Sequence, residues 1–315
     1  MLYGRYTFSC IFEDDAILPE YKGSTFRGVF GHALKRLVCV LKRQDCADCI
    51  LRSQCVYALV FESQAWPDKI GENPRVVSPP HPYVIEPPDD TTTNYSKGDP
   101  FSFTLILFGK ANEYLPYFIY AFDKMEKIGI GKRIGGKRPS FSLEDVSVNG
   151  NIVYRSEDGK IKEGVFTEPL TLDGLKPDKD KSVNGLELSL VTPLRVKYEN
   201  RLEATMPFHV LTRAMLRRTS SLSQHFGKGL PNIDYRGLVE RAKAVSINAS
   251  SLRWFDWKRY SSKQDQEMFM GGITGKVAYS GDLTEFIPLL RFCKKVHLGK
   301  QTTFGLGKIK MRMAS

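Results

Sequence analysis

The sequence predicts an α+β protein of two domains, each built from a few strands and helices. The chain has 315 residues, which suggests two domains at roughly 150 residues each. Apolar runs at strand and helix spacing occur in the same order in both halves. A segment rich in Gly and Lys follows the last predicted helix of each half. These observations together indicate a duplicated fold.

In the first half, the apolar spacing predicts strands and helices in alternation. Apolar residues from Phe26 to Leu37 recur at helical spacing, and either Ser24 or Thr25 is in position to cap that helix. The prolines from Pro79 to Pro88 indicate irregular or edge structure. The elements predicted here are a strand at 2–13, that helix, a buried strand at 101–108, a helix at 114–125 and a strand pair at 141–154 turning at Asn149-Gly150.

After residues 156–182, a charged segment that we interpret as a linker, the same order returns. The elements predicted there are a strand at 186–196, a helix at 208–222, a short helix at 235–244, hairpin strands at 245–255 and 272–279, a helix at 283–293 and a last strand. Each half reads roughly as β-α-β-β-α, a glycine-rich loop and β, which is the ferredoxin-like order, and the middle strands of the first half are the least clear part of this pattern. We therefore expect tandem ferredoxin-like domains at 1–155 and 183–315.

The positive charge is concentrated in the second half. Residues 1–182 hold 24 basic and 25 acidic side chains, whereas residues 183–315 hold 22 basic and 10 acidic ones. A basic field attracts phosphate polyanions and releases their counterions on binding. The charge distribution favours nucleic-acid binding, although a basic protein without that function shows the same balance.

Four of the six cysteines fall within 17 residues, in an insertion after the first helix. They are Cys39, Cys46, Cys49 and Cys55. The two-residue gap in Cys46-Ala-Asp-Cys49 lets both thiolates converge on one tetrahedral metal. Structural zinc is the first interpretation, since four thiolates leave no coordination position open. An iron–sulfur cluster and reduced, unmetallated thiols remain alternatives.

Both glycine-rich segments carry basic residues. The first reads Gly129-Ile-Gly-Lys-Arg-Ile-Gly-Gly-Lys-Arg138, and the second reads Gly299-Lys-Gln-Thr-Thr-Phe-Gly-Leu-Gly307-Lys308. Glycine lets backbone amides approach phosphate closely, and the adjacent cations supply charge. The first segment is not a P-loop, because Arg138 stands where Ser or Thr would hold magnesium. Two such loops favour a site for a phosphate backbone.

Three stretches of the chain resemble one family. Residues 270–290, followed by His297-Leu-Gly-Lys-Gln-Thr-Thr-Phe-Gly-Leu-Gly307, resemble the C-terminus of CRISPR-associated endoribonucleases that process precursor CRISPR RNA. This is the sixth Cas family, within the RAMP superfamily. Tyr21–Leu34 with the four cysteines, and Ile128–Arg133, are similar to the cysteine-bearing branch of that family. The similarity runs over most of the chain.

The resemblance implies domains like RNA-recognition modules that bind RNA with basic loops and cut it without a metal or other cofactor. In that chemistry the ribose 2′-hydroxyl attacks the scissile phosphate and leaves a 2′,3′-cyclic phosphate or 3′-phosphate and a 5′-hydroxyl. The reaction needs a base, an acid and cationic stabilisation of the phosphorane. Histidine suits the first two roles because its unperturbed pKa is about 6.5.

The same resemblance implies where the catalytic residues lie. The family's catalytic histidine often lies on or near the first helix, where His32 stands one turn before Arg36. Tyr21 precedes that helix much as a tyrosine does in some relatives. Lys35 and Arg36 are candidates for charge stabilisation. His225, beside Gly227-Lys228-Gly229, is the alternative histidine.

The expected RNA contacts are cations of the first predicted helix of each half, of the two glycine-rich loops and of the aromatic hairpin between residues 245 and 279. Aromatic side chains beside cations can stack on unpaired bases and hold phosphates. His297 is expected either to touch RNA or to hold the second loop through a backbone hydrogen bond. The full set is Arg27, Lys132, Arg133, Lys137, Arg138, Arg213, Arg217, Arg218, Lys258, Arg259, His297, Lys300 and Lys308.

Two further functions are compatible with these residues. A catalytically inert RAMP subunit that binds guide RNA in an effector complex would need the same basic loops. A zinc-dependent structural or DNA-binding protein would use the basic half on duplex DNA, but no recognition helix is evident.

The expected partners are CRISPR repeat RNA and proteins of a CRISPR effector complex, with the chain as a monomer or homodimer. No apolar run approaches the ~20 residues that a membrane helix needs. The start Met-Leu-Tyr-Gly-Arg-Tyr lacks the features of a secretion signal, so we expect a cytoplasmic protein without a membrane span.

Overall fold

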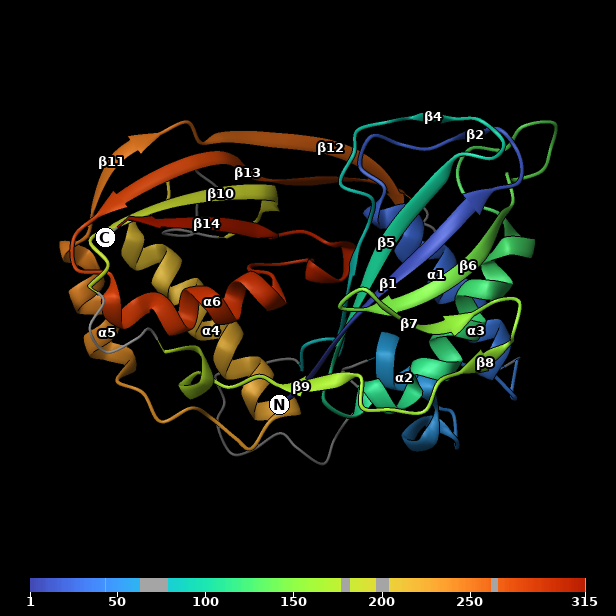
Figure 1. Cartoon of the computed structure of the whole chain (residues 1–315), viewed down its shortest axis with the longest axis horizontal. Helices are drawn as coiled ribbons and strands as arrows, with labels where there is room; N and C mark the ends of the chain where they lie inside the picture. The colour runs from blue at the N-terminus through green and yellow to red at the C-terminus, as the bar shows by residue number, and fades with distance from the viewer. Residues whose placement is uncertain (43, 63–78, 177–181, 197–203, 262–265, 315) are drawn as a thin grey trace. The chain divides into compact units, whose positions relative to one another are not determined.

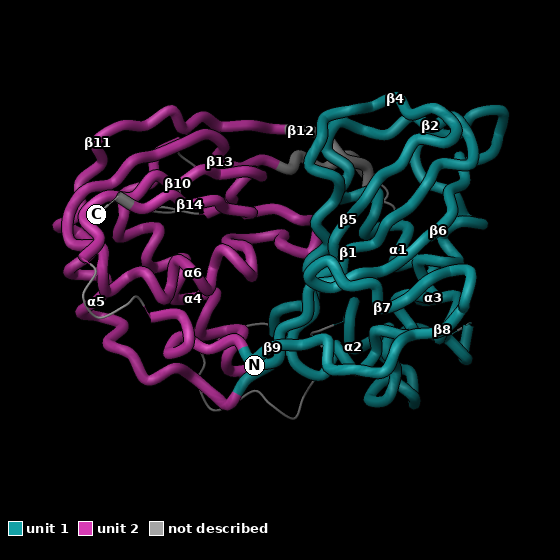
Figure 2. The backbone as a smooth tube through the Cα atoms, in the orientation of Figure 1, with its two compact units in different colours: residues 1–169, 225–227 teal, residues 170–224, 228–315 magenta. Residues whose placement is uncertain are grey.

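The computed structural model describes residues 1–42, 44–62, 79–176, 182–196, 204–261 and 266–314, without the side chains of 257–261, 266–270 and 314. Two compact units divide the chain (Figure 2). Unit 1 comprises Met1–Pro169 with His225–Gly227, and unit 2 comprises Leu170–Gln224 with Lys228–Ser315. Each unit has its own sheet and its own helices.

The described sheet of unit 1 has seven strands, and four consecutive ones, starting from one edge, follow the ferredoxin-like order. Strands β3 (Tyr83–Glu86), β5 (Pro100–Phe108), β1 (Leu2–Phe12) and β6 (Phe141–Val148) are neighbours in that order, and each pair is antiparallel. The proline-flanked β3 is an edge strand, as predicted. Strands β7 (Asn151–Arg155) and β8 (Lys160–Ile161) extend the sheet beyond β6, and β9 (Thr167–Pro169) pairs with the start of β1.

Helices α1 (Gly23–Val38) and α3 (Leu115–Ile128) cover one face of this sheet (Figure 1). Their apolar stripes contact each other and the strands, and Phe30 stacks on Phe122 with ring centroids 4.5 Å apart. Phe8 of β1 lies 4.8 Å from Phe122 and 4.9 Å from Phe103 of β5. This aromatic core fixes the register of α1, the helix that carries most of the catalytic candidates.

The start of α1 differs from the prediction. Lys22, rather than Ser24 or Thr25, is the N-cap residue, and no side chain caps the helix. The carbonyl of Lys22 already accepts the amide of Phe26 at 3.1 Å, so Ser24 and Thr25 lie inside the first turn. The buried Lys22 ammonium instead pairs with Asp90 at 3.2 Å, which anchors the segment entering the helix.

Unit 2 repeats the same order. Strands β11 (Ser246–Ser250), β13 (Gln266–Ser280), β10 (Gly185–Leu194) and β14 (Ile309–Ala314) are antiparallel neighbours, and β12 (Arg253–Ser261) pairs with the other end of β13. Helices α4 (Phe208–Phe226) and α6 (Ile287–Val296) cover one face (Figure 1). The predicted α+β class with tandem ferredoxin-like domains is therefore confirmed.

An aromatic contact also anchors the core of unit 2. Phe208 of α4 lies 5.0 Å from both Tyr279 of β13 and Phe286 before α6. Pro288 stands in the first turn of α6, where its missing amide costs no hydrogen bond. The helix then buries Ile287, Leu290 and Cys293 against the sheet.

The boundary between the units falls inside the segment predicted as a linker. Residues 160–169 of that segment form β8 and β9 and complete the sheet of unit 1. In contrast, the carbonyls of Leu175 and Lys176 accept hydrogen bonds from Arg291 of α6, and both residues belong to unit 2. Polar composition alone did not reveal these short pairings, because each strand contributes only two or three residues.

The remaining elements are short. They are β2 (Ala16–Ile17), β4 (Asn94–Tyr95), α2 (Val56–Phe61), α5 (Tyr235–Arg241) and the 3₁₀ turns η1 (Arg52–Gln54), η4 (Gly109–Tyr114), η5 (Asp173–Leu175), η6 (Ala242–Ala244), η7 (Thr284–Phe286) and η8 (Thr302–Phe304). Among the helices that the structure describes, none is long and apolar enough to cross a membrane.

Candidate active site

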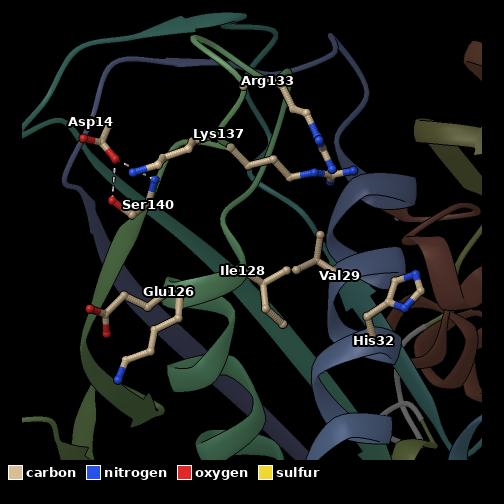
Figure 3. A pocket seen from close by; sticks show the side chains of 11 residues that line it. Asp14, Val29, His32, Glu126, Ile128, Arg133, Lys137 and Ser140 are labelled. Atoms are coloured by element: carbon tan, nitrogen blue, oxygen red, sulfur yellow. Dashed lines mark hydrogen bonds between the residues drawn. The ribbon is translucent and has the colours of Figure 1, made fainter.

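A cleft of about 880 Å³ in unit 1 brings His32 together with the first glycine-rich loop (Figure 3). Residues from α1, from the end of α3, from the loop and from the end of β1 line it. They are Asp14, Val29, His32, Glu126, Lys127, Ile128, Arg133, Gly136, Lys137, Arg138 and Ser140. Four of these side chains are cations and two are carboxylates, so the lining has a net positive charge.

His32 reaches the cleft because of the pitch of α1. Phe26, Val29, Phe30 and Ala33 point to the core, which leaves His32 exposed on the other face of the same helix. Figure 3 shows the apolar side chains of Val29 and Ile128 meeting between His32 and the acidic side of the cleft. The imidazole is therefore open to a ligand and is not held in the core.

The first glycine-rich loop presents its cations on a tight turn. Ile134 and Lys137 exchange two backbone hydrogen bonds, of 2.8 and 3.2 Å, around Gly135 and Gly136. Both glycines have positive φ, +57° and +82°, as a two-residue turn of this kind requires. Residues 132–138 are all exposed, so the turn projects Arg133, Lys137 and Arg138 to solvent.

Two earlier glycines let this loop pass close to neighbouring backbone. A Cβ at Gly129 would stand 2.6 Å from the carbonyl oxygen of Arg138, and one at Gly131 would stand 2.5 Å from that of Ile17. This close approach lets the amide of Lys132 donate a hydrogen bond to the Ile17 carbonyl at 2.9 Å. The base of the loop is fixed to β2, whereas its tip is free of such contacts.

Asp14 anchors the other side of the cleft. Its carboxylate accepts hydrogen bonds from the hydroxyl and from the amide of Ser140, the latter at 3.0 Å. These bonds, and then the charges of Lys97 and Lys137, lower the pKa of the Asp14 carboxyl. Asp14 therefore stays charged and fixes the strand that leaves the loop.

Other candidates on α1 have different surroundings. The Lys35 ammonium lies over the ring of Tyr57 at 5.4 Å, and the Arg27 guanidinium lies over that of Phe61 at 5.3 Å, so both contact α2. Arg36 is exposed and shares the His32 face of the helix, one turn later. Tyr21 is half-buried just before the helix, and burial raises the pKa of its phenol.

The second glycine-rich loop is mostly buried. Residues 302–307 have almost no exposed surface, and His297 is completely buried with its Nδ1 donating to the Leu306 carbonyl at 3.0 Å. Of the two roles expected for His297, the structure shows the one that holds the loop. Arg218 of α4 donates to the carbonyls of Val296 and His297, and burial lowers its pKa to about 10. Arg218 therefore caps α6 rather than facing solvent.

The remaining basic candidates are dispersed. Arg213 and Arg217 on α4 and Lys300 at the start of the second loop are exposed, and Lys308 is half-buried. His225 lies one residue before the end of α4 and belongs to unit 1. The side chains of Lys258 and Arg259 lie outside the described residues.

The four cysteines of the insertion are half-buried, and none of them forms a disulfide. Burial raises the pKa of the Cys46 thiol, with Glu62, Cys55 and Cys39 adding to the effect and Lys35 opposing it. Within the described ranges, no three His, Cys, Asp or Glu side chains form a group that could hold a metal ion.

Sequence reasoning missed the acidic and hydroxyl residues of the cleft, Asp14, Glu126 and Ser140. A partial signal exists for Asp14 and Ser140, since they directly follow and precede the predicted strands 2–13 and 141–154. Only the antiparallel pairing of β1 with β6, in which Phe12 faces Phe141, brings the two together.

In chemical terms, the cleft combines an exposed imidazole with a group of cations. Such a set can bind a phosphodiester and transfer a proton near it.

Comparisons with known proteins find matches to both parts of the chain. One family model, described as an N-terminal domain, matches residues 1–165, and the model of the CRISPR-associated endoribonuclease Cas6 matches residues 188–309. An uncharacterized protein of Archaeoglobus fulgidus is 26% identical over 305 residues, which cover 94% of this chain and 93% of that protein.

Solved structures share the fold at low identity. A Cas6 product complex, of a protein from Thermus thermophilus, has a TM-score of 0.54 at 15% identity, with 98% of this chain and 100% of that chain covered. A partial Cas6-RT-Cas1–Cas2 complex has a TM-score of 0.59 at 15% identity and 99% coverage, and this chain spans 46% of the matched chain. The match over residues 188–309 thus indicates a protein of the Cas6 type, and the solved Cas6 structures share its fold.

Proposed function

We propose that this protein cuts precursor CRISPR RNA within its repeats, without a metal in the chemical step. The supporting observation is the cleft of unit 1, whose lining includes the exposed His32 of α1 together with Arg133, Lys137 and Arg138. The cleft supplies positive charge from its own side chains, which is the electrostatic contribution that the phosphorane needs.

The proposed reaction is a transesterification. The 2′-hydroxyl oxygen upstream of the scissile phosphate forms a new bond to phosphorus, and the bond from phosphorus to the 5′-oxygen breaks. A base accepts the 2′-hydroxyl proton, and an acid donates a proton to the leaving 5′-oxygen. The products are a 2′,3′-cyclic phosphate, or the 3′-phosphate after hydrolysis, and a 5′-hydroxyl.

We assign the proton transfer at one of these two oxygens to His32. Lys137 and Arg133 would hold the scissile phosphate, because both side chains extend from the exposed turn at Gly135-Gly136 and line the cleft. Arg36, one turn along α1 from His32, would contact the next phosphate. Tyr21 would donate a hydrogen bond to the RNA. Its phenol stays neutral, since burial raises its pKa.

Two assignments remain as alternatives within this proposal. His225 would replace His32 as the proton-transfer group if His32 proves dispensable. Lys35 would act on RNA only after leaving the ring of Tyr57, so we give it a smaller contribution than Arg36. The exposed cations of unit 2, Arg213, Arg217 and Lys300, would bind the RNA backbone.

The proposed partners are repeat RNA and other CRISPR proteins. A relative occurs in a complex with Cas1 and Cas2, which supports a protein partner of the same system for this chain.

A cleavage assay tests the proposal. End-labelled repeat RNA from the same genome is incubated with wild-type protein or His32→Ala in excess EDTA. We expect one defined cut with a cyclic-phosphate or 3′-phosphate end, and a loss of rate of at least about 100-fold in the variant. RNA affinity should stay within a few-fold of wild type.

Two controls make the result specific. A 2′-deoxy nucleotide before the scissile phosphate removes the nucleophile and should abolish the cut while leaving binding. Lys124→Ala, on α3 but outside the cleft lining, should cut at the wild-type rate. A full rate in His32→Ala would transfer the role to His225, whereas tight binding of several repeat RNAs with no cut would indicate an inert RNA-binding subunit.

A further inference from the structure

The lining of the cleft in unit 1 contains a carboxylate that phosphate binding does not explain. Four cations and the carboxylates of Asp14 and Glu126 line this cleft. A carboxylate repels a phosphodiester, so each of the two acids weakens the attraction of the cleft for an RNA backbone. Asp14 has a structural reason to be there, because it accepts two hydrogen bonds from Ser140. Glu126 needs a different explanation.

Contacts within the fold do not account for Glu126. Among the residues that the structure describes, none donates a hydrogen bond to its carboxylate and no cation forms an ion pair with it. Its position is also unfavourable, since it lies in the last turn of α3, where the helix dipole disfavours negative charge. The side chain is half-buried in the cleft lining, so its two oxygens are available as acceptors for a ligand there.

An apolar surface, formed by Val29 and Ile128, lies beside this acceptor. Figure 3 shows the two side chains meeting between Glu126 and His32. The cleft volume of about 880 Å³ is in the range of pockets that hold small molecules. In single-stranded RNA, an unstacked base can lie with its face against such side chains while its edge forms hydrogen bonds. The surroundings of Glu126 therefore suit a nucleobase better than a phosphate.

The chemistry of a carboxylate selects among the bases of RNA. Both of its oxygens accept hydrogen bonds, and neither donates one. On its Watson–Crick edge, guanine presents two adjacent donors, N1–H and the 2-amino group, which match the two oxygens. Adenine and cytosine place an acceptor nitrogen beside their amino group, and uracil has a single N–H between two carbonyls, so each of these bases turns an acceptor toward the carboxylate. Lys127, the next residue of the lining, can donate to the O6 of guanine.

We propose that Glu126 is a specificity-determining residue that binds the Watson–Crick edge of one guanine of the repeat RNA, with the apolar surface against the face of the base. This inference rests on the proposed function, because it takes RNA as the occupant of the cleft. Helices α1 and α3 hold the site rigidly, since Phe30 of α1 stacks on Phe122 of α3. Recognition of this guanine would therefore set which phosphate lies beside His32.

Binding of modified repeat RNA tests this inference without relying on cleavage. Each guanosine of the repeat is replaced in turn by inosine, which lacks only the 2-amino group, and the RNA carries a 2′-deoxy nucleotide at the cut wherever the wild type cuts it. We expect one position at which the wild type binds guanosine about 10-fold more tightly than inosine. In Glu126→Gln, whose side chain presents one acceptor and one donor group, this preference should fall below about 2-fold.

The absolute affinities separate recognition from a loss of structure. Glu126→Gln removes a negative charge, so it should bind the inosine RNA at least as tightly as the wild type does. Glu113→Gln, the same change at an exposed position of η4 outside the cleft lining, should keep the full preference. Inosine weakens any base pair of the RNA equally for all three proteins, so only the difference between proteins counts. If the glutamine variant fails to fold, Glu126→Ala tests the same contact, since alanine is a strong helix former.

A guanosine preference that is equal in the wild type and in Glu126→Gln would overturn the inference, as would the absence of such a position in the wild type. The proposed function can fail separately. A wild type that binds but cuts no repeat RNA refutes that function, whereas a guanosine preference that disappears in Glu126→Gln still supports the recognition. A wild type that binds no repeat RNA would overturn both.

Discussion

The two glycine-rich loops have similar compositions but different structures. In the first, residues 132–138 are exposed on a turn whose tip has no neighbour within contact distance of Gly135 or Gly136. In the second, residues 302–307 are buried, and the loop is bound from three directions. The Thr192 hydroxyl donates to Gly305, His297 donates to Leu306, and the amide of Leu298 donates to Gly307.

This contrast shows that glycine and lysine in a loop do not determine its role. In the first loop, glycine permits a tight turn that displays cations. In the second, glycine permits close backbone packing, since a Cβ at Gly299 would stand 2.7 Å from the Arg195 carbonyl oxygen. The first loop displays exposed cations, whereas the second loop is held in shape by its own packing and hydrogen bonds.

The largest expected effect is on the packing of the second loop. Gly307→Ala combines φ of +74° with an overlap between the new Cβ and the backbone of Leu298. We expect a loss of about 3 kcal/mol in the free energy of unfolding, measured by urea denaturation. The matched change Gly136→Ala has φ of +82° but open space around the Cβ, so it should cost only about 1 kcal/mol.

Equal losses in the two variants would contradict the comparison. They would mean that the strain of a positive φ, common to both sites, determines the cost and that the close packing of the second loop contributes nothing.

An intermediate effect is expected on RNA binding by the first loop. The double variant Arg133→Ala/Lys137→Ala should weaken binding of single-stranded repeat RNA about 10-fold, without a change in Tm. The slope of log affinity against log salt concentration should fall by about 0.7 for each lost phosphate contact. Titrations at several salt concentrations measure both quantities, with Lys124→Ala as the control. An unchanged slope would show that these cations do not contact phosphate.

The smallest expected effect is on the stability that Asp14 contributes through its hydrogen bonds to Ser140, just after the first loop. The folded pKa of Asp14 lies below its unfolded value, so its stabilising contribution is present above pH 3.8 and is lost as the pH falls below that value. Asp14→Asn should therefore lower Tm slightly at neutral pH, and the difference from wild type should disappear in acid. Thermal unfolding from pH 7 to pH 3 measures this, and a difference that persists at the acid end would refute the role of the charge.

Much of the fold could be predicted from local patterns. The spacing of Phe26, Val29, Phe30 and Ala33 gave α1, and Asn149-Gly150 gave the turn between β6 and β7, where φ is +50° and +82°. The short strands β8 and β9 could not be predicted, because two or three residues carry no periodicity and pair only when β7 and β1 are already in place.

The candidate site was predicted only in part. Lys137 was selected from the loop composition and His32 from the family resemblance, as separate candidates, and the structure places both in the lining of one cleft. Asp14 and Ser140 were missed, since their contact depends on the pairing of β1 with β6. Arg218 was expected to face RNA as one of three arginines on α4, but its position on the helix turns it toward the end of α6.

The sequence by itself determined the longer strands and the main helices, the duplication and the position of both glycine-rich loops, but not the short strands β3, β8 and β9. These depend on residues within a few positions of each other, whose spacing and backbone preferences act before any tertiary contact forms. Only the tertiary structure decided which loop displays its cations and which one buries its backbone. That outcome depends on Thr192, Arg218 and Ile17, residues distant in the sequence whose hydrogen-bonding groups meet the loops only after the sheets have formed.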